Sequence, residues 1–378
     1  PLPRHRCCYL VVGSAPILMA ASSVAFGQNS PPMTPPEPDQ TITVTANLQD
    51  TPAKTAPGSI TVVTPAQIKS QFNGNAGQAI RERAGILVNS AGSPGRQTDV
   101  FIRGSAANQI LVLIDGIKVS DPSAPGRGID FANINLDQVE RIEILKGPQS
   151  GLYGSDAMGG VINIITQSGR GVEAQATVSL EGHSLGGGTA TGQVLGGGRR
   201  AHLGLTTSYD QLDGISAARA ADGNKEKDGH KITTAHLKTG YDVTDNFSLL
   251  SVVRFAKTAV DLDFTGGPGG DDPNSQQRQQ TISAKIEGSW LLLDDKWEVI
   301  PRVLATDIDR EQDNPADTPD DPNTLNQRYR GRIEAAEMVS HHRWRSDCVA
   351  TVGTRFEKES FRLDDKLDSD NSLPERFT

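Results

Sequence analysis

The sequence predicts an α+β domain followed by part of an antiparallel transmembrane β-barrel. Between residues 58 and 166, short apolar runs alternate with helix-start signals, as in a compact α+β domain. From residue 171 onward, segments of alternating apolar and polar residues are separated by connections that are alternately short and long, which is typical of a transmembrane barrel. A soluble β-sandwich is the alternative, because it would show the same strand spacing.

Composition excludes two broad classes of protein. The 378 residues include 37 Lys and Arg against 46 Asp and Glu, a formal net charge of −9, which argues against a nucleic-acid binder. The mean hydropathy is −0.40, and no run of about 18 apolar residues occurs, which excludes an ordinary helical membrane protein. These values do not exclude a transmembrane β-barrel, because lipid-facing and lumen-facing side chains alternate along its strands and the mean hydropathy is therefore polar.

Residues 1–27 predict a secretory signal peptide. Basic residues at 4–6 precede the apolar stretch 7–19, and small residues follow. Cleavage after Ala25 or after Gly27 fits this pattern. The alternative is an apolar N-terminal helix, which a glycine and a proline would interrupt.

Residues 28–51 predict a proline-rich linker that contains one isolated strand. Five prolines lie between Gln28 and Gln40, so an extended chain is expected there. The strand pattern follows, strictly alternating and without a partner nearby, over Thr41, Ile42, Thr43, Val44, Thr45 and Ala46. Such a segment is suited to pairing with an edge strand of another protein through backbone hydrogen bonds. The alternative is an ordinary first strand of the following domain.

Residues 52–168 predict the compact α+β domain. Thr64, followed by Pro65 and then Gln67, forms a helix-start signal with a capping box. The turn Asp115-Gly116 closes the apolar strand before it. A second helix is expected at 76–84, and strands are expected at 59–64, 86–89, 100–103, 110–114, 140–146 and 161–166.

The glycine-rich block 147–160 joins the last two of these strands. Glycine permits positive φ and close backbone approach where the chain folds tightly. The alternative is that this block binds phosphate as part of an enzyme. No Gly-Lys-Ser/Thr follows the glycines, and the sequence contains no catalytic constellation, so we expect no enzyme.

Four motifs, in order along the chain, resemble those of the TonB-dependent outer-membrane receptors of Gram-negative bacteria. They are the TonB box at 41–46, the central strand of the plug domain at 101–104, the next strand and turn at 110–118, and the closing block at 141–166. Within this family, the sequence is most similar to that of the cobalamin receptors at 115–116, 153–157 and 161–166. Ferric-siderophore receptors share most of these motifs.

The resemblance implies an active importer located in the outer membrane. Residues 52–168 would be a plug inside the barrel, and ligand binding would expose residues 41–46 to TonB. Force drawn from the proton gradient would then displace the plug. The implied partners are TonB, cobalamin or a siderophore, and outer-membrane lipid, with no nucleic acid. A fragment that only binds its partners is a further alternative.

The ligand would contact loops at the outer tip of the plug. By position the candidates are Asn89, Ser93, Arg96, Gln97, Ser120, Ser123 and Arg127. These residues lie in two loops, 89–97 and 120–128, and a solvated turn is the alternative for either loop taken alone. Four charged residues are expected either to face the barrel wall or to pair within the plug: Arg103, Glu140, Arg141 and Lys146.

The resemblance to cobalamin receptors also implies Ca²⁺ as a possible bound ion, with no other cofactor. The acidic candidates are Asp228, Asp261, Asp263, Asp271 and Asp272. Acidic, oxygen-rich loops suit Ca²⁺. Plain solvated loops are the favoured alternative, because Glu226 and Lys227 depart from the expected acidic run.

Residues 171–378 predict only the N-terminal part of the barrel. They offer about nine candidate strands, whereas receptors of this family close their barrel with far more. The sequence also ends, at 374–378, without the terminal aromatic strand usual in outer-membrane chains. Open edges are not tolerated in lipid, so we expect a C-terminally truncated receptor.

Overall fold

The computed structural model describes part of the chain: residues 43–44, 51–52, 58–70, 75–81, 83–90, 97–124, 127–215, 227–262, 274–315, 325–345, 348–365 and 375–377. The signal peptide predicted for residues 1–27 lies outside the described residues, as does most of the linker predicted for 28–51. No helix within the described ranges is long and apolar enough to cross a membrane.

The N-terminal unit, residues 58–168, is built on a five-stranded mixed sheet in the order β3-β8-β9-β6-β7. Its strands are β3 (Ser59–Val63), β6 (Ile110–Ile114), β7 (Ile117–Lys118), β8 (Val139–Lys146) and β9 (Gly160–Thr166). β6 and β9 run parallel, and the other pairs are antiparallel. A separate antiparallel hairpin consists of β4 (Ile86–Ser90) and β5 (Thr98–Ile102).

The helices of the N-terminal unit are short. They are α1 (Pro65–Ser70), α2 (Ala76–Arg81), α3 (Ser150–Tyr153) and the 3₁₀ turns η1 (Ala107–Gln109), η3 (Phe131–Asn133) and η4 (Ser155–Ala157). The predicted capping box is confirmed, since the Thr64 amide donates to Gln67 Oε1 at 3.1 Å and the Gln67 amide donates to Thr64 Oγ1 at 3.4 Å. The second helix ends earlier than predicted, because a turn closed by the Arg83 amide and the Ile80 carbonyl redirects the chain into β4.

The main core of the N-terminal unit lies between the mixed sheet and α2. Ile142, Ile144, Ile162 and Ile164 are fully buried there against Ile80 of the helix. Burying each such side chain stabilises the fold by roughly 1.5–3 kcal/mol. This explains why the β-branched run at the end of the glycine-rich block forms a central strand.

The second half of the chain forms one long antiparallel sheet of ten strands, paired in sequence order. They are β10 (Gln175–Gly182), β11 (Gly187–Gly197), β12 (Ala201–Ile215), β13 (Asp228–Thr244), β14 (Phe247–Leu262), β15 (Ser275–Leu292), β16 (Trp297–Asn314), β17 (Leu325–Arg345), β18 (Cys348–Asp365) and β19 (Glu375–Phe377). β10 and β19 are its edge strands within the described ranges. The predicted fold class, an α+β unit followed by part of an antiparallel barrel, is confirmed.

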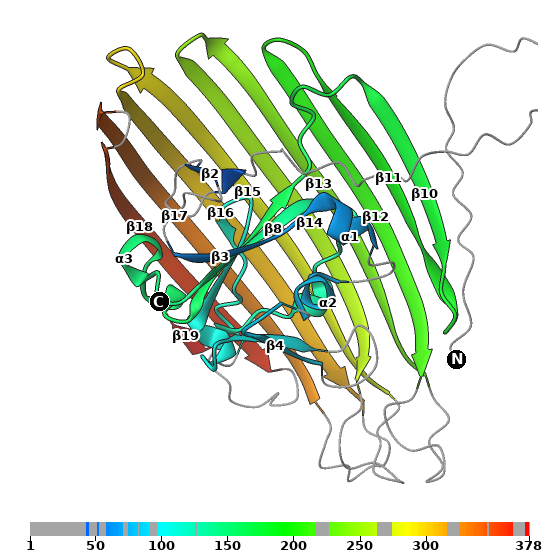
Figure 1. Cartoon of the computed structure of the whole chain (residues 1–378). Coiled ribbons are helices and arrows are strands. Elements are labelled where there is room, and N and C mark those ends of the chain that lie inside the picture. The colour runs from blue at the N-terminus through cyan, green and yellow to red at the C-terminus, as the bar shows by residue number, and fades with distance from the viewer. Residues whose placement is uncertain are drawn as a thin grey trace, which may run out of the picture.

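The N-terminal unit lies against one face of the long sheet, here called the inner face (Figure 1). Along β14, Val252 and Val260 point inward and are buried, whereas Val253 between them is 40% exposed on the outer face. The outer face is apolar along much of its length, with Ile286, Val303 and Phe356 more than half exposed. An outer face of this kind is what a lipid-facing wall presents.

The two ends of the long sheet differ. Short connections at 198–200, 245–246 and 293–296 join strands at one end, and β2 (Thr51–Pro52) lies toward this end (Figure 1). At the other end the connections that follow β12, β14, β16 and β18 are longer, whereas the β10–β11 connection at 183–186 is short, and the β4–β5 hairpin lies toward this end (Figure 1). In a transmembrane barrel the short turns face the periplasm and the long loops face the exterior.

Candidate functional site

The candidate site is the interface between the N-terminal unit and the inner face of the long sheet. Hydrogen bonds and ion pairs join the two surfaces at several places along this interface. An apolar cluster of Ile117 with Val252, Leu304 and Ala335 accompanies them. Polar groups at such an interface can exchange their partners for water when the surfaces separate.

Asp115 is the most deeply enclosed charge of this interface. It lies in the turn between β6 and β7, and its side chain is 2% exposed. Lys238 Nζ on β13 lies 2.7 Å from Asp115 Oδ1 and also donates to the Thr166 carbonyl at 3.2 Å. His236 Nε2, on the same strand, lies 3.2 Å from Asp115 Oδ2. The carboxylate therefore joins the tip of β6 to the long sheet, which is called the wall from here on.

The local backbone holds Asp115 in place. Asp115 and Gly116 have φ values of +49° and +81°, the left-handed pair that a tight hairpin turn requires. The Asp115 amide donates to the Ile164 carbonyl at 2.9 Å, and the Thr166 amide donates to Asp115 Oδ1 at 3.2 Å. The turn is thus fixed to β9 on one side before it meets the wall on the other.

The contacts of Asp115 keep it ionised despite its burial. Burial alone would raise the pKa of the carboxyl. The charge of Lys238 and the hydrogen bond with His236 outweigh burial and hold the pKa of Asp115 well below its usual value. A buried charge that keeps its partners in this way is stable, but removing one partner would leave the other uncompensated.

A ladder of ion pairs crosses the inner face from β15 to the N-terminal unit. Each charge on it contacts the next, in the order Lys285, Glu287, Arg302, Glu337, Arg355, Glu357 and Lys118. The ladder begins close to the Asp115 turn, because a Cβ added to Gly116 would lie 3.6 Å from Lys285 Nζ. Its far end, Lys118, lies on β7 directly after that turn.

Lys118 and Arg127 form a second attachment, to β18. Lys118 Nζ contacts Glu357 at 3.1 Å, Glu359 at 2.9 Å and Asp156 of η4. Arg127 pairs with the same Glu359 and lies 3.6 Å from Asp156. Burial lowers the pKa of Lys118, but the neighbouring carboxylates outweigh it and raise that pKa, so the ammonium stays charged.

Two further attachments were not predicted from the sequence. Asp137 accepts hydrogen bonds from Thr191 Oγ1 at 2.6 Å and Ser208 Oγ at 2.7 Å. Near Asp121 the wall strand β17 carries Gly331, where an added Cβ would lie 2.9 Å from Pro122 Cγ. The sequence signal available for such residues was an acidic side chain directly after a buried strand or turn, because a carboxylate placed there needs a partner.

The four charged residues considered for the wall do not supply these contacts. Arg103 donates to Ser59 Oγ at 2.9 Å and to the Lys146 carbonyl at 3.4 Å. Arg141 pairs with Glu140 and Glu143, and Lys146 Nζ donates to the Ala84 carbonyl. Ion pairing within the unit is therefore found for Glu140 and Arg141, whereas Arg103 and Lys146 are used within the same unit as donors to a hydroxyl and to backbone carbonyls rather than in contacts with the wall.

The structure brings two of the predicted ligand residues together. Ser120 and Arg127 line one cavity of about 240 Å³ in the N-terminal unit, together with Lys118 and Asp156. The Ser120 hydroxyl is buried and has no hydrogen-bond partner among the described residues. A polar cavity with an unpartnered donor and two cations is suited to oxygen-rich ligand groups.

The other predicted ligand residues lie apart from this cavity. Asn89 lies on β4, and Gln97, just before β5, donates to Asp99 at 3.2 Å. The Ser123 hydroxyl donates to Asp121 Oδ1 at 2.6 Å, and its carbonyl accepts from Arg310 of the wall at 3.2 Å. Ser93 and Arg96 lie outside the described residues.

The acidic residues considered for Ca²⁺ are only partly described. Asp228 is buried at the start of β13, and Asp261 accepts hydrogen bonds from the Gly229 amide and from Gln276. Asp263, Asp271 and Asp272 lie outside the described residues. Within the described ranges, no group of three or more His, Cys, Asp or Glu is arranged to hold a metal ion.

The predicted TonB box is described for two residues only. Thr43 and Val44 form β1 (Thr43–Val44), which pairs antiparallel with β2 through two residue pairs. The expectation that this strand has no partner nearby is therefore wrong, because the chain turns back within a few residues to supply one. Thr41, Ile42, Thr45 and Ala46 lie outside the described residues. A ladder this short contributes little stability by itself.

Comparison with known proteins places these features in context. Residues 52–161 match the TonB-dependent receptor plug domain. The chain is 28% identical over 354 residues to the vitamin B12 transporter BtuB of Photobacterium profundum, an alignment that covers 93% of this chain and 56% of that protein. The match to BtuB of Vibrio vulnificus is 39% identical over 142 residues, or 38% of this chain and 23% of that protein.

The fold is also similar to that of solved receptors. The siderophore receptor PiuA of Acinetobacter baumannii superposes with a TM-score of 0.65 at 15% identity, covering 84% of this chain and 47% of that one. At this identity the likeness concerns the fold alone. The chain spans about half the length of the relatives it matches along most of its length.

Proposed function

Since this chain belongs to the TonB-dependent receptor family, whose members reside in the outer membrane of Gram-negative bacteria, we propose that the intact protein is an active importer of cobalamin. The N-terminal unit would be the gate of the import path. The observation that supports cobalamin as the ligand is the similarity to a vitamin B12 transporter along nearly the whole chain. The proposed activity is recognition and displacement, with no chemical step.

The polar interface supports a displaceable plug. Asp115, Lys118 and Arg127 hold the N-terminal unit to the wall through charged contacts. Separating an apolar interface would expose hydrocarbon to water, at about 25 cal/mol per Å². Separating charged groups instead returns them to water, which solvates them well. The N-terminal unit can therefore move without crossing the large barrier that an apolar interface would impose.

The short ladder of β1 supports energy transfer through TonB. Thr43 and Val44 pair with only two residues of β2, so their backbone groups can exchange this partner for a strand of TonB. The segment lies on the periplasmic side in the proposed orientation, because β2 lies toward the end with short connections (Figure 1). Residues 41–46 would then transmit the pull to the N-terminal unit.

The cavity at Ser120 and Arg127 supports ligand sensing. Its volume of about 240 Å³ is too small to enclose a ligand the size of cobalamin, which would place one edge there. Cobalamin carries amide and phosphate groups, which suit a free hydroxyl and a guanidinium. Any ligand group that competes for Arg127 weakens its pairing with Glu359 of the wall. Ligand binding would thereby loosen one attachment of the N-terminal unit.

A ferric siderophore is the second candidate ligand, because the fold is shared with a siderophore receptor. A protein that binds its partners without transport is the third possibility. For Asp228 and Asp261 we propose a structural role, since both interact with neighbouring groups, Asp261 with the Gly229 amide of β13 and with Gln276 of β15. Ca²⁺ is therefore treated as a variable in the test.

The test is calorimetric titration of the intact gene product, extracted from the outer membrane, with cyanocobalamin in the presence and absence of Ca²⁺. Saturable binding of cyanocobalamin, with none of a ferric siderophore, is the expected result. Stronger binding with Ca²⁺ would overturn the purely structural role of the two aspartates. Siderophore binding alone would reverse the ligand assignment, and no binding of either would contradict the import proposal.

A further inference from the structure

The outer face of the long sheet changes abruptly from apolar to charged. One cross-strand row is wholly apolar and consists of Ile286, Val303, Ala336 and Phe356. Two residues further along each strand, toward the long connections, the next row contains Glu334 and Lys358. The two rows after that are Ile282, Asp307, Arg332 and Ser360, and then Gln280, Asp309, Arg330 and Arg362.

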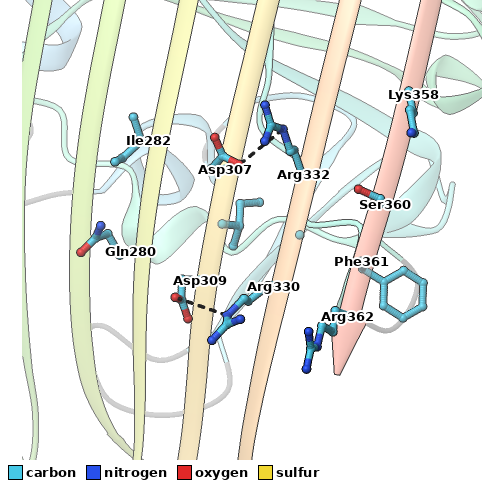
Figure 2. Close-up of a pocket in the computed structure, with 12 residues that line it drawn as sticks. Gln280, Ile282, Asp307, Asp309, Arg330, Arg332, Lys358, Ser360, Phe361 and Arg362 are labelled. Atoms are coloured by element: carbon cyan, nitrogen blue, oxygen red, sulfur yellow. Dashed lines mark ion pairs between the residues drawn. The ribbon is translucent and has the colours of Figure 1, made fainter. Parts of the chain in front are cut away.

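These charged rows surround a cavity of about 580 Å³ on the outer face (Figure 2). Four cationic side chains and two carboxylates line it: Arg330, Arg332, Lys358 and Arg362, with Asp307 and Asp309. Figure 2 shows Arg332 paired with Asp307 and Arg330 paired with Asp309, at 3.7 and 4.0 Å. Glu334 and Asp364 add further carboxylate contacts to the guanidinium groups.

The cations of the cavity keep donors for a ligand. Arg330 and Arg332 are 48% and 55% exposed, and each presents five N–H donors, of which its two carboxylate partners together engage at most four. Lys358 has no ion-pair partner among the described residues, although Glu334 lies opposite it across the strands. Clustered guanidinium and ammonium groups with unused donors are the usual ligands of phosphate.

The height of the cavity places it at a membrane surface. Trp297 marks the short-connection end of β16, and Asp307 lies ten residues further along that strand. Ten residues span about 33 Å, and a strand tilted by about 40° rises about 25 Å over that length. The apolar band of an outer-membrane barrel has about this height. The charged rows therefore begin where the hydrocarbon ends, on the side of the long loops.

We propose that this cavity binds the phosphate of an anionic lipid in the outer leaflet, with its acyl chains lying along the apolar row of Ile286, Val303 and Phe356. The inference rests on the proposed outer-membrane location. It does not depend on the ligand that is imported. The group that the cavity binds is phosphate, and it belongs to a lipid headgroup rather than to the free ion.

The test uses the intact protein extracted from the outer membrane in mild detergent. Native mass spectrometry would measure retention of added lipid A that carries both phosphates, compared with the same lipid after dephosphorylation. The variants are Lys358→Gln and the double variant Arg332→Gln/Lys358→Gln. The matched control is Lys257→Gln, because Lys257 lies on the outer face in the same cross-strand row as Gln280 but outside the cavity.

Wild type and Lys257→Gln should retain the phosphorylated lipid equally, and each cation removed from the cavity should lower its retention about fivefold. Equal retention by all variants, or equal retention of the dephosphorylated lipid, would overturn the proposal. Displacement of the lipid by micromolar inorganic phosphate would show a free-phosphate site and also overturn it. Cyanocobalamin binding, measured on the same samples, should be unchanged, which separates this inference from the import proposal.

Discussion

Lys238 of β13 lies 2.7 Å from the carboxylate of Asp115, a residue of the β6–β7 turn in the N-terminal unit. The two side chains are 11% and 2% exposed, so the pair is nearly withdrawn from water. It joins two parts of the chain that are far apart in sequence and differ in structural class. The mobility of the N-terminal unit relative to the wall should depend on this contact.

We first predict that Asp115→Asn loosens the N-terminal unit from the wall. The substitution keeps the shape of the side chain but leaves the buried Lys238 ammonium without its counter-charge, at a cost of roughly 3–5 kcal/mol. Hydrogen exchange of β9 in the intact protein would report the loss, because Thr166 is held by the same carboxylate. Adding Lys238→Met should recover part of the loss.

The control for this prediction is Asp242→Asn. Asp242 pairs with Arg170 at 3.3 Å, and the arginine is 66% exposed, so the loss should stay below about 1 kcal/mol. Similar exchange rates in the Asp115→Asn and Asp242→Asn proteins would contradict the role given to Asp115.

The second prediction concerns Asp130, which accepts hydrogen bonds from the Thr98 and Ala132 amides at 2.8 and 2.9 Å. Burial raises the pKa of Asp130 to about 6, and the nearby charge of Asp99 adds to the effect, against these hydrogen bonds. A carboxyl whose folded pKa exceeds its unfolded pKa favours folding at low pH. Its contribution is complete below pH 4 and is lost as the pH rises through 6.

The measurement is the free energy of unfolding of wild type minus that of Asp130→Asn, at pH 4 and at pH 7. This difference should be larger at pH 4 by roughly 2–3 kcal/mol. Asparagine keeps an acceptor for both amides and does not titrate, so other acidic groups cancel in the comparison. A difference that is constant between the two pH values would refute the buried-carboxyl assignment.

The third prediction concerns the proposed strand exchange at Val44. Val44→Pro removes a backbone donor and should lower cobalamin uptake to about a tenth or less, because TonB pairing depends on the backbone. Equilibrium binding of cyanocobalamin should stay unchanged. Val44→Thr keeps the backbone donor and should transport normally. Uptake that is equally impaired in both variants would point to a side-chain effect instead.

The fourth prediction separates two residues of the ligand loop. Arg127→Ala should weaken cyanocobalamin binding about tenfold, as expected for the loss of one charged hydrogen bond. Ser123→Ala should have little effect, because the Ser123 hydroxyl already donates to Asp121 within its own turn. Titration calorimetry of the two variants decides the point. A larger loss for Ser123→Ala would move the ligand away from the cavity.

Local patterns in the sequence were sufficient for much of the fold. The capping box at Thr64 and Gln67 and the Asp115-Gly116 turn were predicted because each depends on neighbours within a few residues. The alternation along β14 and β16 was predicted for the same reason, since one face of a strand follows directly from residue order. The motifs at 101–104, 110–118 and 141–166 identified the family.

Only the tertiary structure decided which charges meet. Arg103 and Lys146 looked as suited to the wall as Asp115 and Lys118, yet the first two are used within the N-terminal unit and the last two reach β13 and β18. Strand periodicity states which face a residue occupies, but not the register between distant strands or which edge of the unit opposes the wall. Those relations arise when the two parts pack together, so Lys238 and Glu359 become partners of the N-terminal unit only in three dimensions.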